Sequence, residues 1–565
     1  MSDYPVIQED KKNMPWTMGF GVLLCLTILW LCVILYSYPL FQAARALDPY
    51  ANVNTFIPQF CIFTAFFIMV ILVLYRKFSI GKWMNLGMLS LSAVVLWFTP
   101  YLMAGWVKQT DTLWHLGMAA NAGDILHGLE MPFSSYTTSF PISYMFGNLV
   151  CQVTGLELQV LGNYVLPLFF TFLFTLFIYL ILVKFFSRNS ATLATLMSIG
   201  LLHYVELHMS PHVIGLVILF TCLLLLSRKQ WIIAILLGIG LLPLTHTVSF
   251  GFFILFLALY FIYQMGGMDI LYGKRDSGRF SRRLLLLIIG LGAIGAAFVL
   301  TFTSLSKYGA MLVESLSLSK LFYFVAENLL HNPWFKVLST VIYIGIFVLF
   351  CFLAIRHVPH FRGKRFRIAY LPRVLARSGS MMPLFALGCL ALGILVASVL
   401  ERSVMIERGL TIFMIIGSGF IVTGLLSSKD KRPWLMVLIA ALFVTYPFAS
   451  YPVDNYNTFP VSEEAGMNFL SGMELTDAII DMPSPGQLDA FTEPGMNIST
   501  FINNSQTFSI VVFRLSAAQK YFIHTGDDDR YYYKFERLER DNDYSVVYCN
   551  PSFKIFTITQ SGVNA

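Results

Sequence analysis

Long runs of apolar residues recur along most of this chain of 565 residues, and they limit the folds that it can adopt. A run of about 20 apolar residues matches the thickness of a bilayer, and within lipid a helix satisfies every backbone hydrogen bond of such a run. Hydrophobic residues make up 57% of the sequence and charged residues only 12%, which exceeds what soluble domains need. The sequence therefore predicts an all-α membrane protein.

About thirteen transmembrane helices are predicted from the positions of these runs. The first run is longer than the core of a signal peptide and lacks a clear small-residue cleavage site, so we expect it to be retained. The predicted spans cover Trp16–Leu40, Phe56–Tyr75, Leu86–Met103, Val160–Val183, Leu193–Val205, Val213–Leu226, Trp231–Thr245, Phe250–Tyr263, Leu284–Phe302, Phe335–Ile355, Met381–Val399, Leu410–Leu426 and Trp434–Phe448.

Positively charged residues fall in alternate loops between these spans, and the cytoplasmic loops of membrane proteins carry such an excess. This bias predicts a multi-pass protein of the cell membrane whose N-terminus is cytoplasmic. The loop at residues 105–159 and the C-terminal part then lie on the extracytoplasmic face. Ile142–Val153 is apolar but short, and counting it as a crossing would move the basic loop at residues 356–377 outside. We therefore expect an interfacial helix there.

Composition divides the chain into three parts. Residues 1–83 hold two N-terminal spans, residues 84–450 form the main membrane domain, and residues 451–565 are acidic. The last part has 7 Lys or Arg against 15 Asp or Glu, a net charge of −8 that leaves +15 for the membrane part. This change of sign indicates a separate domain beyond the last span.

The acidic part carries patterns typical of a small α/β domain. Ser462, followed by two Glu residues and an apolar pair, predicts a capped helix. Short apolar stretches predict strands near residues 478–480, 508–513, 544–548 and 553–558, the last two forming a hairpin. The fold class predicted for the whole chain is thus a polytopic helical bundle with a small extracytoplasmic α/β domain.

The loop at residues 105–159 is polar between apolar neighbours, and it holds two Asp and a His beside the bilayer. Asp111 precedes a predicted interfacial helix at Thr112–Leu129, where its carboxylate can be a general base or a helix cap. His115 lies four residues on, so it can orient the carboxylate, contact substrate or join Asp111 in a site for a divalent cation such as Mg²⁺ or Mn²⁺. Asp124 suits a substrate contact or a solvated helix surface.

Cationic and histidine side chains are predicted at the external ends of later spans. Arg402 and Arg408 lie where other cations are few, and a guanidinium binds phosphate well in a low-dielectric setting. His212 begins one span, and His246 ends another, where its ring can also cap the helix. These side chains predict a site for a phosphate, and a lipid phosphate would be a natural ligand.

Other classes of site find less support in the sequence. His203, His208 and His212 raise the question of a zinc site, but no thiolate and no close histidine pair on a long helix accompanies them, so the metal content stays open. No phosphate-cradling glycine-rich loop and no exposed Ser/His/Asp motif occurs, which argues against an ATP-driven pump and a serine hydrolase. The acidic tail has no basic patch, so no nucleic acid partner is expected.

Five motifs, taken in their order along the chain, resemble those of a known family. They are Asp111-Thr112-Leu113-Trp114-His115, Phe140-Pro141, Ser210-Pro211-His212, Leu244-Thr245-His246 and Glu407-Arg408-Gly409. Over roughly residues 86–426 the chain resembles the GT-C glycosyltransferases, in particular multi-spanning prokaryotic members of archaeal type. It differs from them in His212, where related proteins tend to have Gln, and in the two spans that precede the usual first one.

The resemblance implies a GT-C-like bundle that transfers a sugar from a polyprenyl phosphate or pyrophosphate donor to a glycan, lipid or protein acceptor. Asp111 would be the general base for the acceptor hydroxyl. Arg408, with Arg402 as an alternative, would bind the lipid phosphate, while membrane lipid holds the prenyl chain. The remaining contacts to sugar or phosphate would come from His115, Asp124, His212 and His246.

Two other functions are compatible with a polar site at a membrane surface. A flippase or transporter of lipid-linked sugars would place its polar groups near the bilayer midplane on interrupted helices in repeated halves, and the sequence has no clear internal repeat. A non-catalytic membrane scaffold of the same fold would keep a polar cavity at the membrane surface but would not depend on Asp111. The sugar, the acceptor and the stereochemical outcome are not specified by the sequence.

Overall fold

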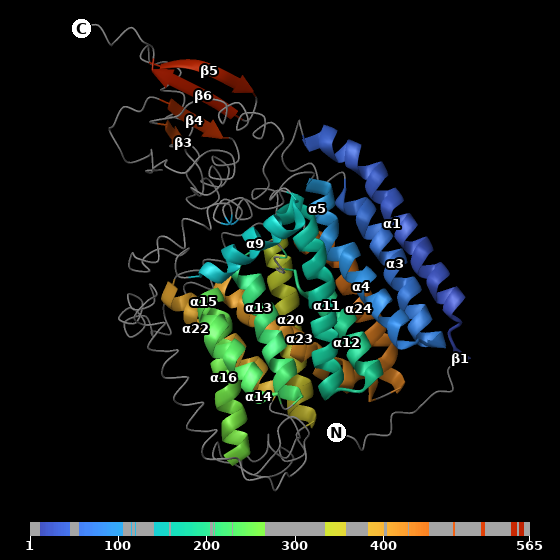
Figure 1. The fold of residues 1–565 in the computed structure, drawn as a ribbon. Coiled ribbons are helices and arrows are strands. Elements are labelled where there is room, and N and C mark those ends of the chain that lie inside the picture. Colours follow the sequence, from blue (N-terminus) through green and yellow to red (C-terminus); the bar gives the residue numbers. More distant parts are fainter. Residues whose placement is uncertain are drawn as a thin grey trace, which may run out of the picture.

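The computed structural model describes fewer residues than the sequence contains. They are residues 12–45, 56–104, 115, 119, 140–156, 160–203, 207, 210–228, 230–265, 334–357, 382–400, 404–427, 429–450, 478–480, 510–514, 544–550 and 553–558. Within them the chain forms a bundle of packed helices and a separate small β-sheet (Figure 1).

The helices and strands of the described residues have the following bounds. The α-helices are α1 (Trp16–Arg45), α3 (Ile57–Lys77), α4 (Lys82–Ala93), α5 (Thr99–Ala104), α9 (Pro141–Thr154), α11 (Leu166–Phe185), α12 (Arg188–Leu201), α13 (Pro211–Ser227), α14 (Trp231–Ile235), α15 (Leu242–Thr245), α16 (Thr247–Met265), α20 (Trp334–His357), α22 (Met382–Leu400), α23 (Val404–Leu426) and α24 (Arg432–Ser450). Three π-helical turns, η1 (Val94–Phe98), η3 (Leu161–Val165) and η4 (Leu236–Leu241), and a 3₁₀ turn, η7 (Lys429–Lys431), adjoin them. The strands are β1 (Lys12–Asn13), β2 (Phe78–Ser79), β3 (Ala478–Ile480), β4 (Ile510–Arg514), β5 (Tyr544–Asn550) and β6 (Phe553–Ile558).

Six helical stretches among the described residues are long and apolar enough to cross a membrane. They are Trp16–Phe41, Ile57–Lys77, Lys82–Met103, Leu166–Phe185, Ile406–Leu426 and Arg432–Ala449. Five further apolar helices are shorter. The prediction of a helical membrane protein is therefore confirmed. The count of thirteen crossings stays a prediction, and the predicted span Leu284–Phe302 lies outside the described residues.

One end of the bundle gathers basic residues and tryptophans. The short strands β1 and β2 pair in parallel, with Lys12 opposite Phe78, which brings the start of α1 to the connection between α3 and α4. Arg188 joins them there, since its Nη2 donates to the carbonyl oxygen of Ile80 at 3.1 Å. Four helices begin at this end with a tryptophan among their first three residues: Trp16, Trp83, Trp231 and Trp434. Such a level of Trp beside Lys and Arg is typical of a membrane interface.

The opposite end of the bundle carries α5, α9 and α15 (Figure 1). Helix α9 runs across this end, over the ends of the long helices, as expected for an interfacial helix (Figure 1). Its Ser143, Tyr144 and Gly147 are buried, whereas Leu149 and Val153 are exposed. Helix α9 therefore turns Ser143, Tyr144 and Gly147 inward and exposes apolar residues on its other side.

The four predicted strands of the acidic part are present and form one mixed sheet in the order β3-β4-β6-β5. Strand β4 pairs in parallel with β3 and antiparallel with β6, and β5 and β6 form the predicted hairpin. In Figure 1 this sheet lies beyond the end of the bundle that carries α5 and α9. The helix predicted at Ser462 lies outside the described residues.

Candidate functional site

His246 lies at a break between two helices, at the end of the bundle that α9 covers. The short helix α15 contains Pro243 in its first turn, and at His246 the backbone turns to an extended conformation (φ −165°, ψ 117°) before α16 begins. The side chain is almost completely buried, with 2% of its surface exposed. A polar ring buried at a helix junction needs hydrogen-bond partners, and this one has them on both sides.

Arg408, in the second turn of α23, donates a hydrogen bond from Nη1 to Nε2 of His246 at 2.7 Å. A guanidinium can only donate, so Nε2 must be the acceptor and the ring proton must be on Nδ1. Nδ1 then donates to Oγ of Ser249 at 3.0 Å. The amide nitrogen of Ser249 also lies 3.2 Å from Nδ1, but this contact would be a hydrogen bond only in the other tautomer, which the Arg408 contact excludes.

The environment of His246 keeps its ring neutral. Burial lowers the pKa of His246 well below the ordinary imidazole range, and the positive charge of Arg408 and the neighbouring ring of His212 lower this pKa further. The lowered pKa and the hydrogen bond from Arg408 both require a neutral ring, because an imidazolium could not accept that hydrogen bond.

His212 completes the basic cluster. Ser210 caps α13, with its Oγ accepting from the amide of Val213, and Pro211 occupies the first turn, so His212 falls at the second position of the helix. Its ring centroid lies 5.0 Å from that of His246, and its side chain is partly exposed. We call His212, His246 and Arg408 the basic triad.

Two glycines allow the helices of the basic triad to approach closely. A Cβ added to Gly215 of α13 would lie 2.6 Å from Cβ of His246 and 2.9 Å from Oγ of Ser249. A Cβ added to Gly409, next to Arg408, would lie 2.5 Å from the carbonyl oxygen of Cys389 in α22. Larger side chains at either position would push the helices apart, so these glycines help to set the distances in the triad.

Helix α9 connects the basic triad to the first large loop. Phe140, the residue before α9, has its ring centroid 6.3 Å from that of His246. One turn into α9, the hydroxyl of Tyr144 lies 3.1 Å from Nδ1 of His115. Asn148, one turn further, donates from Nδ2 to the carbonyl oxygen of Ala119 at 2.8 Å. His115 and Ala119 are therefore both hydrogen-bonded to residues of α9 that lie one turn apart.

The predicted site residues fall into two groups. His115, His212, His246 and Arg408 are described, and the last three are in one cluster. His115 is buried and contacts α9 rather than the triad. Asp111, Asp124 and Arg402 lie outside the described residues, so their roles stay predictions.

Several residues around the site were not singled out in the sequence. Ser249, whose hydroxyl accepts from Nδ1 of His246, lies three residues after it, a spacing that a helix start makes accessible. Tyr144 and Asn148 lie one turn apart in the predicted interfacial helix, and this spacing was the signal that they share a face. Gly215 carries no local signal, because its role depends on α16 passing close by.

His203 is held by aromatic side chains and does not join a metal site in the described part of the chain. Its ring packs against Tyr343 and Tyr446, with centroids 5.4 Å and 5.3 Å away. Nε2 lies 3.1 Å from the carbonyl oxygen of Gly200. Among the described residues no group of three or more His, Cys, Asp or Glu is arranged to hold a metal ion, and His208 lies outside them.

Tyrosines from three helices bind the backbone after α12. The hydroxyl of Tyr343 donates to the carbonyl oxygen of Leu201, and that of Tyr446 to the carbonyl oxygen of Leu202. The hydroxyl of Tyr101 accepts from the amide of Leu207. These bonds anchor the segment that leads from α12 to Ser210 and the triad.

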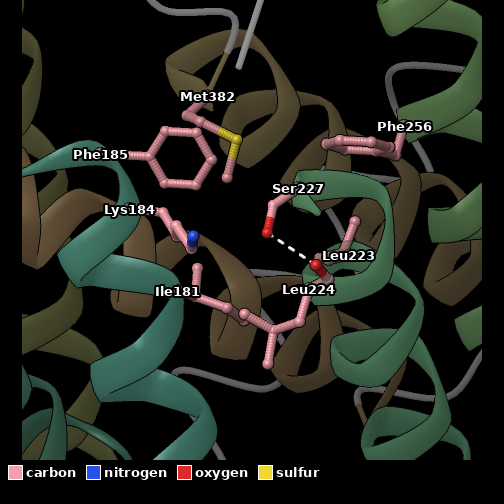
Figure 2. Close-up of a pocket in the computed structure, with 8 residues that line it drawn as sticks. All are labelled: Ile181, Lys184, Phe185, Leu223, Leu224, Ser227, Phe256 and Met382. Carbon is pink, nitrogen blue, oxygen red and sulfur yellow. Dashed lines mark hydrogen bonds between the residues drawn. The ribbon is translucent and has the colours of Figure 1, made fainter. Parts of the chain in front are cut away.

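A small pocket at the other end of α13 is apolar and separate from the triad (Figure 2). It lies between α11, α13, α16 and α22, beside Lys184 and Ser227, and its space of about 10 Å³ holds no more than one water molecule. Oγ of Ser227 donates to the carbonyl oxygen of Leu224 at 2.6 Å rather than pointing at a ligand (Figure 2). This pocket is a packing defect and not a substrate site.

The basic triad offers a guanidinium, a neutral buried acceptor and a partly exposed imidazole in one place. Such a set can bind an anion and stabilise negative charge that develops on a leaving group. It lies at the opposite end of the bundle from Lys12 and Arg188. The chain matches no protein-family model and no curated protein sequence.

Proposed function

We propose that the protein is a membrane glycosyltransferase of the GT-C type that takes its sugar from a polyprenyl phosphate or pyrophosphate donor. The acceptor is a glycan, lipid or protein on the extracytoplasmic face. The proposal rests most directly on the 2.7 Å contact between Arg408 and His246, beside His212. That contact presents a fixed guanidinium at a membrane-facing helix junction, where the phosphate of a lipid can reach it.

In the proposed reaction a carboxylate and a guanidinium have separate roles. Asp111, in the loop that α9 anchors through His115, accepts the proton of the acceptor hydroxyl as it attacks the sugar. The bond between the sugar and the phosphate oxygen breaks, and Arg408, with Arg402 as an alternative, takes up the negative charge left on the phosphate. His212 would donate a hydrogen bond to the same phosphate, and Asp124 would contact the sugar.

The proposed orientation follows from the two ends of the bundle. The end with Lys12, Arg188 and the four tryptophans is the cytoplasmic interface, and the end with α9 and the triad is extracytoplasmic. The acidic domain would then lie outside, above the site. Because donor and acceptor meet on this face, no nucleotide-linked sugar needs to cross the membrane.

Transfer from polyprenyl-linked sugars to a mixture of acceptors tests the proposal. The full-length protein and the variants Asp111→Asn and Arg408→Ala are reconstituted in lipid, and donor binding and single-turnover transfer are measured. Loss of the base should lower transfer by about 10²–10⁴-fold with donor binding nearly unchanged. Loss of the guanidinium should weaken donor binding by about 10–100-fold and lower transfer as well, because it removes charged hydrogen bonds.

The control is Lys82→Ala, which removes an exposed cation at the opposite end of the bundle and should leave both quantities unchanged. Near-normal transfer by Asp111→Asn would contradict the catalytic role and leave that carboxylate as a helix cap. Movement of the intact lipid-linked sugar across the bilayer without transfer would support a flippase instead. Assays with Mg²⁺, with Mn²⁺ and with a chelator show whether a divalent cation takes part.

A further inference from the structure

We infer that His246 is a positioning residue, which holds the guanidinium of Arg408 in the direction of the donor phosphate and does not bind the donor itself. The inference rests on the proposed function, in which Arg408 binds that phosphate. It differs from the role that the family resemblance implies for His246, a contact to sugar or phosphate.

Both nitrogens of the His246 ring are already used by the protein. Nε2 accepts from Arg408 at 2.7 Å, and Nδ1 donates to Oγ of Ser249 at 3.0 Å. A neutral imidazole has one donor and one acceptor, so these two bonds exhaust its hydrogen-bonding capacity. The ring also packs, in tilted arrangements, against His212 on α13 and Phe140 before α9, with centroids 5.0 Å and 6.3 Å away. A phosphate or sugar would have to displace protein groups to reach it.

The surroundings of His246 hold the ring in one place. Its Cβ lies against the position of the missing side chain of Gly215, and its Nδ1 is bonded within the first turn of α16. Four elements, α9, α13, α15 and α16, therefore define the location of Nε2 to within a narrow range. A fixed acceptor at this point defines where Nη1 of Arg408 must lie.

One fixed hydrogen bond is enough to direct a guanidinium. The group is planar and carries five N–H donors in a rigid fork, so anchoring Nη1 limits the directions of the other four. An arginine side chain otherwise loses rotamer freedom when it binds a ligand. By ordering Arg408 before the donor arrives, His246 lowers this entropic cost and strengthens phosphate binding.

Neutral histidine suits this task better than a carboxylate would. A carboxylate beside Arg408 would neutralise the charge that attracts the phosphate. A protonated imidazole would repel the guanidinium and could not accept its hydrogen bond. The buried, neutral ring gives Arg408 an acceptor and leaves the positive charge of the guanidinium intact.

Two substitutions at position 246 separate positioning from direct binding. His246→Gln keeps a neutral acceptor that can reach toward Nη1 of Arg408, whereas His246→Leu removes it. The full-length variants are placed in lipid nanodiscs, and the binding of a polyprenyl monophosphate is compared with that of the neutral polyprenol. His246→Leu should weaken phosphate binding about tenfold, and His246→Gln should stay within about threefold of wild type. Polyprenol binding should not change in either variant.

Three results would overturn the inference: wild-type binding by His246→Leu, a loss in His246→Gln as large as in His246→Leu, or an equal loss of polyprenol binding. Should His246→Leu fail to fold, Ser249→Ala replaces it, because this variant removes the hydroxyl that accepts the hydrogen bond from Nδ1 of His246. Ser249→Ala should weaken phosphate binding in the wild-type background but not in His246→Gln, which has no ring tautomer to set.

A measurement without any lipid donor distinguishes failure of the inference from failure of the proposed function. If the wild-type protein binds the phosphate and the neutral lipid equally, the proposed function fails. The thermal unfolding midpoints of His246→Leu, which removes the acceptor, of Arg408→Ala and of the double variant still report the link between the two side chains. Additive shifts in these midpoints would contradict the positioning role, and a combined shift smaller than the sum would support it.

Discussion

His246 is a residue whose protonation state should govern how the protein responds to acid. Burial lowers its pKa well below the ordinary value of 6.5, and the charge of Arg408 and the ring of His212 lower this pKa further. At pH values between the lowered pKa and about 6.5 the unfolded chain binds a proton at this position and the folded protein does not. Stability should therefore be highest above about pH 6.5 and fall as the pH decreases below it.

Thermal unfolding of the detergent-solubilised protein at a series of pH values measures this effect. The midpoint should drop by several degrees between about pH 7 and pH 4.5, since buried histidines resist protonation. His246→Gln, whose amide does not titrate, should show a shallower fall. The same slope in wild type and variant would show that His246 contributes nothing to it.

At the scale of helices, the contact between α22 and α23 depends on Gly409. A Cβ there would meet backbone atoms of Cys389 and Leu390, which cannot rotate out of the way as a flexible side chain can. Gly409→Ala should therefore separate the two helices, destabilise the protein by about 1–3 kcal/mol and weaken donor binding through the adjacent Arg408. Thermal unfolding and phosphate-lipid binding measure the two effects.

Gly417, two turns later in α23, provides the matched control. A Cβ at this position would lie 3.6 Å from the nearest atom of Phe350, an ordinary contact. Alanine is also the better helix former, so Gly417→Ala should keep or slightly raise the unfolding midpoint. If both variants behaved alike, the close approach at Gly409 would not be what holds α22 against α23.

The helices were predictable from the sequence because their signals are local, whereas the pairing of His246 with Arg408 was not. Apolar runs, proline at a helix start and the Ser210-Pro211 cap each act over a few residues. His246 and Arg408 are 162 positions apart, and their contact depends on how α16, α22 and α23 pack. The π-helical turn η4 was not predicted either. Pro243 follows shortly after it and lacks the backbone N–H that a regular helix would use as a donor.

At the scale of the whole molecule, the two ends of the bundle can be assigned to sides of the membrane by labelling. In a variant that lacks the natural cysteines, Thr154→Cys at the end of α9 should react with an impermeant maleimide on intact cells. Ser79→Cys in β2 should react only after the membrane is opened, because the proposed orientation places this end of the bundle at the cytoplasmic face. Both positions are exposed on the protein surface. The opposite pattern would reverse the proposed orientation and place the basic triad inside the cell.

Helix α13, which carries His212, is shorter than its neighbour α11. Helix α13 has 17 residues and α11 has 20, so their lengths are about 26 Å and 30 Å at 1.5 Å per residue. The hydrocarbon core of a bilayer is about 30 Å thick, which the longer helix matches and the shorter one does not. No side chain of α13 is exposed, so we expect its neighbours in the bundle to compensate for this hydrophobic mismatch, without deformation of the bilayer. A donor could then present its phosphate at the level of His212 and Arg408 while its isoprenoid chain stays dissolved among the lipid tails.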